Sequence, residues 1–285
     1  MNKKCVFNID KKHFNIEQIF ECGQCFRWER NLYGGFTGVV QNEVINVYTE
    51  GNKLFIVGSL HQKKWIKYFD LLRDYKKIKE ILEVNLVMKK CIKKGYGIRI
   101  LQQDFWETII SFIISANNNI PRIKKIILKF CEYFGEEIET PECFCGKKYY
   151  SFPKIETIAN LETKDLAPIS AGFRDKYIIQ TARKILKLKY EFCSIERDSN
   201  EDIFQKLLKL NGVGEKISNC VLLFSFARYE AFPQDVWINR IMESEFGISK
   251  KEVKKFVVQK FGNYAGIAQQ YLYYYFKKNK VITKV

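Results

Sequence analysis

A change in hydrophobic periodicity near residue 60 constrains the fold more than any other feature of this sequence. Between about 25 and 58, aromatic and β-branched residues alternate with polar ones and are interrupted by YGG, QNE and EGN, which predicts an antiparallel meander. After residue 60 apolar residues recur at helical spacing, and the later helices are expected at 154–161, 174–189, 201–210, 215–227, 236–246, 250–260 and 263–277. The pattern predicts an α+β protein with its antiparallel sheet first.

Three local patterns refine this prediction. Asp104 and Glu107 fit a capping box at the start of one helix, and Pro121 lies in the first turn of the next. Residues 137–152 are expected to form a long connection. The stretch HQKKWIKYFDLLRDYKKIKEIL predicts one apolar helical stripe that contains Trp65, Tyr68, Phe69, Leu72 and Tyr75.

The charge balance indicates a polyanionic partner. The 285 residues carry 48 Lys and Arg against 32 Asp and Glu, a formal net charge of +16. This charge favours nucleic acid over an anionic membrane surface or an acidic protein. The longest apolar runs, TIISFIISA and VLLFSFA, are too short to span a bilayer, and no secretory signal is expected. Nine scattered cysteines, none after Cys220, indicate a reducing compartment and no cysteine-ligated cluster near the C-terminus.

The stretch FQKLLKLNGVGEKISNCVLLF predicts two short helices joined by Gly-Val-Gly at 212–214. Backbone N–H groups at the start of the second helix suit a DNA phosphate, and the glycines allow close approach. Lys216 lies in the first turn of that helix, where the helix dipole disfavours a positive charge by about 0.3–1 kcal/mol. A neutral amine held there can attack the anomeric carbon of a sugar and form a Schiff base. A simple packing motif with a structural lysine is the alternative interpretation.

Asp235 follows Pro233 and precedes an apolar helix, so it is expected to be the N-cap of that helix, worth about 1 kcal/mol. The capping role does not exclude a second role beside the amine of Lys216.

Six segments of the sequence, given in chain order at the end of this paragraph, resemble the helix–hairpin–helix DNA glycosylase superfamily. Within it they resemble the 8-oxoguanine DNA glycosylases of eukaryotic type. The resemblance implies a twisted antiparallel sheet followed by two mainly helical subdomains, with the active site in the cleft between them. It divides the chain into a sheet domain with a flanking helix at 1–100 and a glycosylase region at 101–285, whose hairpin spans about 203–227. The segments are ECGQCFRWE, GIRILQQDFWETIISFIISANNNIPRI, AGFRDKYI, LNGVGEKISNC, FPQDVWI and YAGIAQQYLYYYF.

The resemblance assigns the chemistry to Lys216 as nucleophile and Asp235 as its paired carboxylate. The damaged base must be flipped out of the duplex, and it differs from guanine in carrying an N7–H donor. Gly23 matches the position whose carbonyl accepts from that donor. Gln269 matches the residue that reads the Watson–Crick edge. The two faces of the base slot correspond to Cys220 and Tyr273, the latter at a position where the family often has Phe.

Other positions match residues that contact the rest of the DNA. Asn117 matches the residue that fills the hole left in the duplex, and Arg122 and Arg174 match the pair that binds the opposite cytosine. Phe173 stands where eukaryotic members have a wedging Tyr, and Trp237 replaces a His that contacts phosphate. These two departures predict a looser preference for the opposite base.

The hairpin itself completes the DNA contacts. Gly212 and Gly214 are expected to bring the DNA backbone close to the chain. The resemblance also indicates a structural cation on the backbone carbonyls of Leu208, Leu210 and Val213, while no catalytic metal and no cofactor is expected.

Together these residues predict a bifunctional repair enzyme that excises 8-oxoguanine opposite cytosine through a Lys216 Schiff base and cleaves the strand by β-elimination. Its expected partner is double-stranded DNA containing oxidised guanine, and the protein is expected to act as a monomer. Its expected location is the cytoplasm of a bacterium or the nucleus of a eukaryote. Two alternatives stay open. A monofunctional alkylpurine glycosylase needs Asp235 but not Lys216, and a non-catalytic helix–hairpin–helix protein needs only the glycines.

Overall fold

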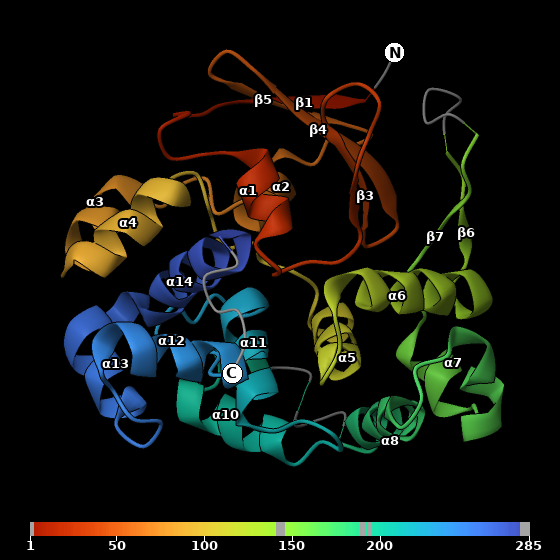
Figure 1. Cartoon of the computed structure of the whole chain (residues 1–285). Helices are drawn as coiled ribbons and strands as arrows, with labels where there is room; N and C mark the ends of the chain where they lie inside the picture. The colour runs from red at the N-terminus through yellow and green to blue at the C-terminus, as the bar shows by residue number, and fades with distance from the viewer. Residues whose placement is uncertain (1–2, 141–145, 189–191, 193–194, 280–285) are drawn as a thin grey trace. The chain divides into compact units, whose positions relative to one another are not determined.

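The structure is a computed structural model that describes residues 3–140, 146–188, 192 and 195–279. The chain forms two compact units, each assembled from three separate stretches. The first unit comprises Met1–Asn8, Cys25–Gln62 and Asp104–Gly214, and the second comprises Ile9–Gln24, Lys63–Gln103 and Glu215–Val285. Figure 1 labels many of the helices and strands of both units.

A five-stranded antiparallel sheet lies in the first unit, with the strand order β1-β5-β4-β3-β2. The meander expected at 25–58 is confirmed as its last four strands. The first strand was not expected; it pairs along β5, from Lys4 opposite Val57 to Asn8 opposite Lys53. The strands are β1 (Lys4–Asn8), β2 (Trp28–Arg30), β3 (Phe36–Val40), β4 (Glu43–Glu50) and β5 (Lys53–Val57).

One glycine of the sheet is required by packing. Gly38 in β3 lies opposite Trp28 in β2, and a Cβ at this glycine would be 2.5 Å from the indole ring. The missing side chain lets the indole lie flat on the sheet, where Trp28 is 2% exposed. The edge strand β2 is thereby fixed against its neighbour.

The rest of the first unit is mainly helical. A two-stranded ribbon of β6 (Glu137–Ile138) and β7 (Tyr149–Tyr150) occupies part of the expected long connection. The helices are α5 (Phe105–Ser115), α6 (Ile120–Phe134), α7 (Ile155–Ala159), η2 (Thr163–Ile169), α8 (Arg174–Lys187), η3 (Ile195–Arg197) and α10 (Asn200–Leu208). Antiparallel strands first and helices after them confirm the expected α+β class.

The helix starts of α5 and α6 follow the sequence signals with one correction. Asp104 caps α5 by accepting a hydrogen bond from the Glu107 N–H at 2.9 Å, and Pro121 lies in the first turn of α6. The other half of the predicted capping box, a hydrogen bond from the Asp104 N–H to the Glu107 carboxylate, was wrong. The Glu107 carboxylate instead accepts from the Arg27 guanidinium at 3.2 Å, a stronger partner than a backbone N–H.

The second unit is built around α14, which packs against α4, α12 and α13. Tyr271 and Leu272 of α14 are completely buried. The helices of this unit are α1 (Ile16–Glu21), α2 (Gln62–Tyr68), α3 (Tyr75–Leu82), α4 (Leu86–Lys94), α11 (Glu215–Phe224), α12 (Val236–Phe246), α13 (Val253–Phe261), η4 (Gly262–Tyr264) and α14 (Ala265–Asn279). The first residue of α2, Gln62, belongs to the first unit.

The single apolar stripe expected between residues 61 and 82 was wrong in part. The stretch forms two helices, α2 and α3, separated by a turn in which Asp70 has a φ of 50°. Trp65, Phe69 and Tyr75 are buried as expected, but Leu72 lies in the turn and is 86% exposed. Periodicity alone did not reveal the break.

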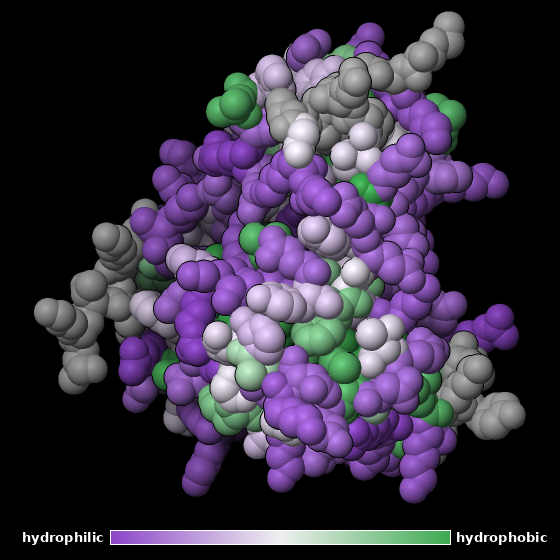
Figure 2. Space-filling view, turned by 90° about the vertical axis from the view of Figure 1, so that its right-hand side faces the viewer, coloured by the Kyte–Doolittle hydropathy of each residue, from purple (hydrophilic) through white to green (hydrophobic). Residues whose placement is uncertain are grey.

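Polar residues dominate one face of the molecule. On the face shown in Figure 2 hydrophilic residues cover most of the area, and apolar residues form small separate patches. Among the described residues, no helix combines the length and the apolar character that crossing a bilayer requires.

Candidate active site

The second unit contains the six residues predicted for catalysis and for the base pocket. They come from four places in its sequence: a turn after α1, the first turns of α11, the start of α12, and the middle of α14. They are Gly23, Lys216, Cys220, Asp235, Gln269 and Tyr273.

Lys216 and Cys220 lie one turn apart on α11, and their side chains form a hydrogen bond. Burial raises the pKa of the Cys220 thiol to about 11, the charge of Lys216 opposes the rise, and that of Asp235 adds to it. The thiol is therefore protonated at neutral pH. The lysine and the carboxylate therefore both lie close to the thiol.

Asp235 is the N-cap of α12, as expected. Its Oδ1 accepts a hydrogen bond from the Ile238 N–H at 2.8 Å, and its backbone is extended. The bond fixes the carboxylate at the helix start. Because the side chain is only half-buried, the remaining oxygen keeps capacity for a second partner.

Gly23 and Tyr273 are in direct contact. Gly23 has a φ of +83°, and a Cβ there would lie 2.9 Å from Cε1 of the Tyr273 ring. Burial raises the pKa of the Tyr273 hydroxyl, and nearby Asp235, Cys22 and Cys220 raise it further. The ring is thus placed between the glycine turn and the cluster on α11.

Gln269 lies on α14 and is 4% exposed. Its Oε1 accepts a hydrogen bond from Nε2 of the neighbouring Gln270 at 2.7 Å. This bond orients the amide of Gln269 and leaves its own N–H donors directed elsewhere.

The first unit contains the residues predicted to contact the opposite base. Arg174 at the start of α8 is 2% exposed and donates hydrogen bonds to the backbone carbonyls of Ala116, Asn117 and Ala171. Asn117 itself is exposed, with a φ of 48°. Three hydrogen bonds from one guanidinium, two to the Ala116 carbonyl and one to that of Asn117, therefore hold the loop after α5 in a backbone conformation that is unusual for a residue other than glycine.

Arg122 is exposed and lies near this loop. Its Nη2 donates to the Ser170 carbonyl at 3.3 Å. Burial lowers the pKa of Arg174, and the charge of Arg122 lowers it further. The structure thus brings Arg122, Arg174 and Asn117 together.

Phe173 is exposed by 58% and is stacked edge-on against Tyr177, with 6.2 Å between the ring centroids. The same Tyr177 covers the hairpin turn, because a Cβ at Gly212 would be 2.7 Å from its ring. Tyr177 was not among the residues predicted from the sequence. Its spacing of four residues after Phe173 on one helix was the available signal.

The remaining hairpin positions differ in their surroundings. At Gly214 a Cβ would meet no atom within 4 Å, so the turn is open on that side. The Leu210 carbonyl accepts from the Val213 N–H at 3.2 Å, which leaves one lone pair for another ligand. Among the described residues, no group of His, Cys, Asp and Glu side chains is arranged to hold a metal ion.

Trp237 lies in the first turn of α12 and is 43% exposed. Val236 beside it is 64% exposed. An indole of this exposure can contact a ligand through its ring or its N–H.

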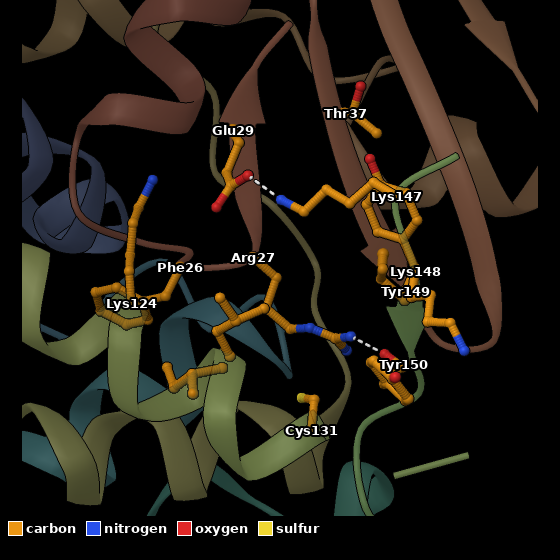
Figure 3. A pocket seen from close by; sticks show the side chains of 13 residues that line it. Phe26, Arg27, Glu29, Thr37, Lys124, Cys131, Lys147, Lys148, Tyr149 and Tyr150 are labelled. Carbon is orange, nitrogen blue, oxygen red and sulfur yellow. Dashed lines mark hydrogen bonds and ion pairs between the residues drawn. The ribbon is translucent and has the colours of Figure 1, made fainter. Parts of the chain in front are cut away.

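A separate pocket in the first unit contains none of the predicted residues (Figure 3). It lies among β2, β3, α6 and β7 and encloses about 510 Å³, including the solvent at its mouth. Its cations are largely engaged: Lys147 pairs with Glu29 at 2.7 Å, and Arg27 bonds the Tyr150 carbonyl and Glu107. The predicted site residues therefore lie outside this pocket.

Two family matches span most of the chain. Residues 6–109 match the family described as 8-oxoguanine DNA glycosylase, N-terminal domain, and residues 110–264 match the HhH-GPD superfamily of base excision DNA repair proteins. A Saccharomyces cerevisiae protein named N-glycosylase/DNA lyase is 31% identical in sequence, and the match covers 93% of this chain and 84% of that protein.

Solved structures show the same similarity in three dimensions. MBOgg1 in complex with a low-affinity DNA ligand is 41% identical with a TM-score of 0.92, covering 98% of this chain and 97% of that one. The Clostridium acetobutylicum 8-oxoguanine glycosylase/lyase, in complex with double-stranded DNA containing cytosine opposite 8-oxoguanine, is 36% identical with a TM-score of 0.90, and 99% of each chain is covered.

Proposed function

Because the chain belongs to the 8-oxoguanine DNA glycosylase family of helix–hairpin–helix base excision repair proteins, we propose that it excises 8-oxoguanine from double-stranded DNA and then cleaves the strand at that site. The net charge of +16 supports binding to a polyanion. The observation that carries the chemistry is the cluster of Lys216, Cys220 and Asp235 at the starts of two helices.

In the proposed reaction the neutral amine of Lys216 attacks C1′ of the flipped nucleotide as the bond to the base breaks. The carboxylate of Asp235 stabilises the positive charge that develops on the sugar, and the departing base takes up a proton. Loss of the second amine proton and opening of the sugar ring give a Schiff base. Removal of a C2′ proton then expels the 3′ phosphate, which is β-elimination.

The proposed base pocket distinguishes the lesion from guanine by a single hydrogen bond. The Gly23 carbonyl accepts from N7–H of 8-oxoguanine, whereas the N7 lone pair of guanine would face the same carbonyl and repel it. Tyr273 and Cys220 contact the two faces of the base, and Gln269 binds its Watson–Crick edge. The contact between Gly23 and the Tyr273 ring supports this pairing of roles.

The opposite strand is proposed to be read by Asn117, Arg122 and Arg174, with Phe173 as the exposed wedge. Without DNA, three of the N–H groups of the Arg174 guanidinium donate hydrogen bonds to the loop after α5. We infer that its first task is to hold Asn117 in place, and that its remaining N–H contacts the cytosine. The place of action is where DNA lies, in the bacterial nucleoid or the eukaryotic nucleus.

Borohydride trapping tests the proposal. The wild-type protein with a duplex containing 8-oxoguanine opposite cytosine should form a covalent adduct, and Lys216→Gln should form none. Lys254→Gln on α13 is the matched control, because it makes the same substitution at an exposed lysine of the same unit. Excision without trapping in the wild type would indicate a monofunctional glycosylase, and binding without excision a non-catalytic protein. An adduct that persists in Lys216→Gln would show that another residue is the nucleophile.

A further inference from the structure

Gln24 follows Gly23, whose backbone carbonyl is proposed to bind the damaged base, and its side-chain amide is hydrogen-bonded at both ends. Gln24 is 1% exposed. Its Nε2 donates to the backbone carbonyls of Ile19 and Arg99, each at 2.9 Å, and its Oε1 accepts from the Leu101 N–H at 2.9 Å. Both ends of this amide are therefore engaged in a buried site, where an unpaired polar group would be destabilising.

A second glutamine holds the backbone of the same residue. Nε2 of Gln103 donates to the Gln24 carbonyl at 2.7 Å. The backbone N–H of Gln103 donates to the carbonyl of Phe224, the last residue of α11, also at 2.7 Å. The segment 99–103 is thus bonded on one side to the residue after Gly23 and on the other to the helix that carries the proposed nucleophile.

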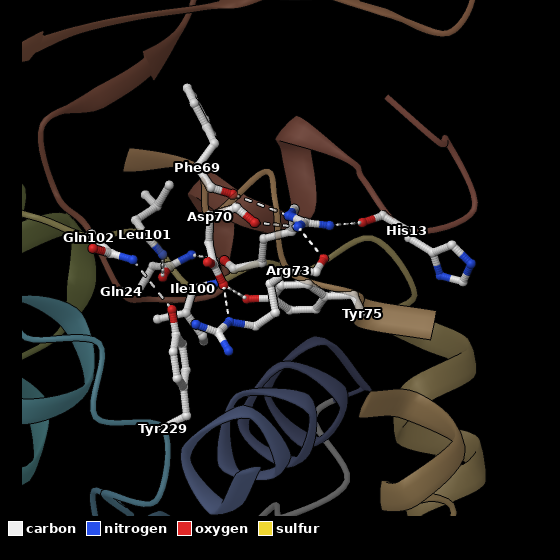
Figure 4. Close-up of polar contacts among 11 residues, drawn as sticks. His13, Gln24, Phe69, Asp70, Arg73, Tyr75, Ile100, Leu101, Gln102 and Tyr229 are labelled. Carbon is white, nitrogen blue, oxygen red and sulfur yellow. Dashed lines mark hydrogen bonds and ion pairs between the residues drawn. The ribbon is translucent and has the colours of Figure 1, made fainter. Parts of the chain in front are cut away.

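That segment is itself fixed by a buried polar network, part of which is seen in Figure 4. The Ile100 N–H donates to the Tyr75 hydroxyl at 2.8 Å, and this hydroxyl donates to the Asp70 carboxylate at 3.1 Å. The Gln102 N–H donates to the Tyr68 carbonyl at 2.9 Å. The guanidinium of Arg99, 6% exposed, donates to the backbone carbonyls of Phe69, Asp70, Arg73 and His13. The segment can therefore serve as a rigid support.

The support matters because of the backbone at Gly23. A glycine with a φ of +83° has no Cβ to restrict rotation about its own bonds. Its carbonyl belongs to the peptide plane that includes the Gln24 nitrogen, so fixing Gln24 fixes the direction of that carbonyl.

We propose that Gln24 and Gln103 are positioning residues for base recognition, which aim the Gly23 carbonyl at the flipped base. They act through the backbone and do not touch the substrate. The inference rests on the proposed function, in which that carbonyl reads the N7–H of 8-oxoguanine. Neither glutamine takes part in the chemistry of Lys216.

Two rates separate recognition from chemistry. Release of 8-oxoguanine from its duplex with cytosine needs the carbonyl, whereas strand cleavage at a preformed abasic site has no base to read. Both are measured under single-turnover conditions for the wild type, Gln24→Met and Gln103→Met. We expect excision to fall about 10–100-fold in Gln24→Met and less in Gln103→Met, with cleavage of the abasic site within about threefold of the wild type.

Gln18→Met is the matched control. Gln18 is 8% exposed in the same unit, and its amide also bridges two backbone groups, donating to the Lys94 carbonyl at 3.2 Å and accepting from the Gly97 N–H at 2.8 Å. The control removes a buried amide of the same kind without touching Gln24. The ratio of excision to cleavage should stay at the wild-type value in this variant.

An unchanged ratio in both Gln24→Met and Gln103→Met would overturn the inference, as would an equal fall of the ratio in Gln18→Met. If Gln24→Met does not fold, Gln103→Met decides alone, because it removes one bond from a half-buried side chain. A wild-type protein that cleaves abasic sites but does not release 8-oxoguanine would instead contradict the proposed function.

Discussion

Replacing Gly23 by alanine places a methyl group against the ring of Tyr273. The new Cβ would be 2.9 Å from Cε1 of the ring, about 0.5 Å inside an ordinary contact of two carbon atoms, and the residue would keep a φ of +83°. The backbone conformation costs about 1–2 kcal/mol for a residue with a Cβ. The overlap adds about 1–3 kcal/mol unless the ring moves.

Gly247→Ala separates these two contributions. Gly247 is in the same unit and has a φ of +65°, and a Cβ there would meet no atom within 4 Å. We expect this control to lower the free energy of unfolding by about 1–2 kcal/mol, and Gly23→Ala to lower it by about 2–5 kcal/mol. The excess measures the contact with the Tyr273 ring.

Denaturant unfolding and single-turnover kinetics on the two substrates provide the assay. If the ring and the Gly23 carbonyl form the base pocket, their displacement should lower 8-oxoguanine excision at least about tenfold in Gly23→Ala. Cleavage of a preformed abasic site should change little. The reasoning is refuted if Gly23→Ala and Gly247→Ala agree in both stability and excision.

Two further predictions concern buried charge in the first unit. Burial raises the pKa of Asp175 to about 6, and its Oδ1 has no hydrogen-bond partner among the described residues. The folded protein therefore binds the proton of the Asp175 carboxyl more tightly than the unfolded chain does. The free energy of unfolding that this proton contributes is lost as the pH rises from about 4 to about 6. Asp175→Asn should raise the free energy of unfolding at pH 7 by about 1 kcal/mol and flatten that dependence, as urea titrations at pH 4 and pH 7 can check. Arg27→Met should lower the free energy of unfolding by about 3 kcal/mol at pH 7, because it leaves the Glu107 carboxylate without its cation. The loss should be smaller at pH 4.5, because burial raises the pKa of Glu107 and the carboxyl then takes up a proton. An equal loss at both pH values would contradict this account.

Local signals in the sequence predicted the elements that rest on neighbouring residues. The N-cap at Asp235 and the spacing of Lys216 and Cys220 on one helix depend on four residues or fewer, and the structure contains both. The alternation after residue 25 likewise located the central strands. Their roles in chemistry came from resemblance and stay predictions.

Contacts between distant residues could not be predicted in the same way. The Glu107 carboxylate turns to Arg27, 80 residues away in the chain, and so leaves the capping box open. Strand β1 has only one fully buried residue, Cys5, and is defined by its pairing with β5. Gln24 reads in the sequence as one polar residue of a turn, and only the fold reveals its partners 75 and 77 residues away.

The buried cysteines have a consequence for durability. Cys5, Cys22, Cys91, Cys131 and Cys220 are free thiols inside the protein, and burial raises the pKa of each. Peroxides attack the thiolate, which such groups hardly populate at neutral pH. We therefore expect peroxides, which belong to the oxidants that damage guanine, to oxidise these buried thiols only slowly.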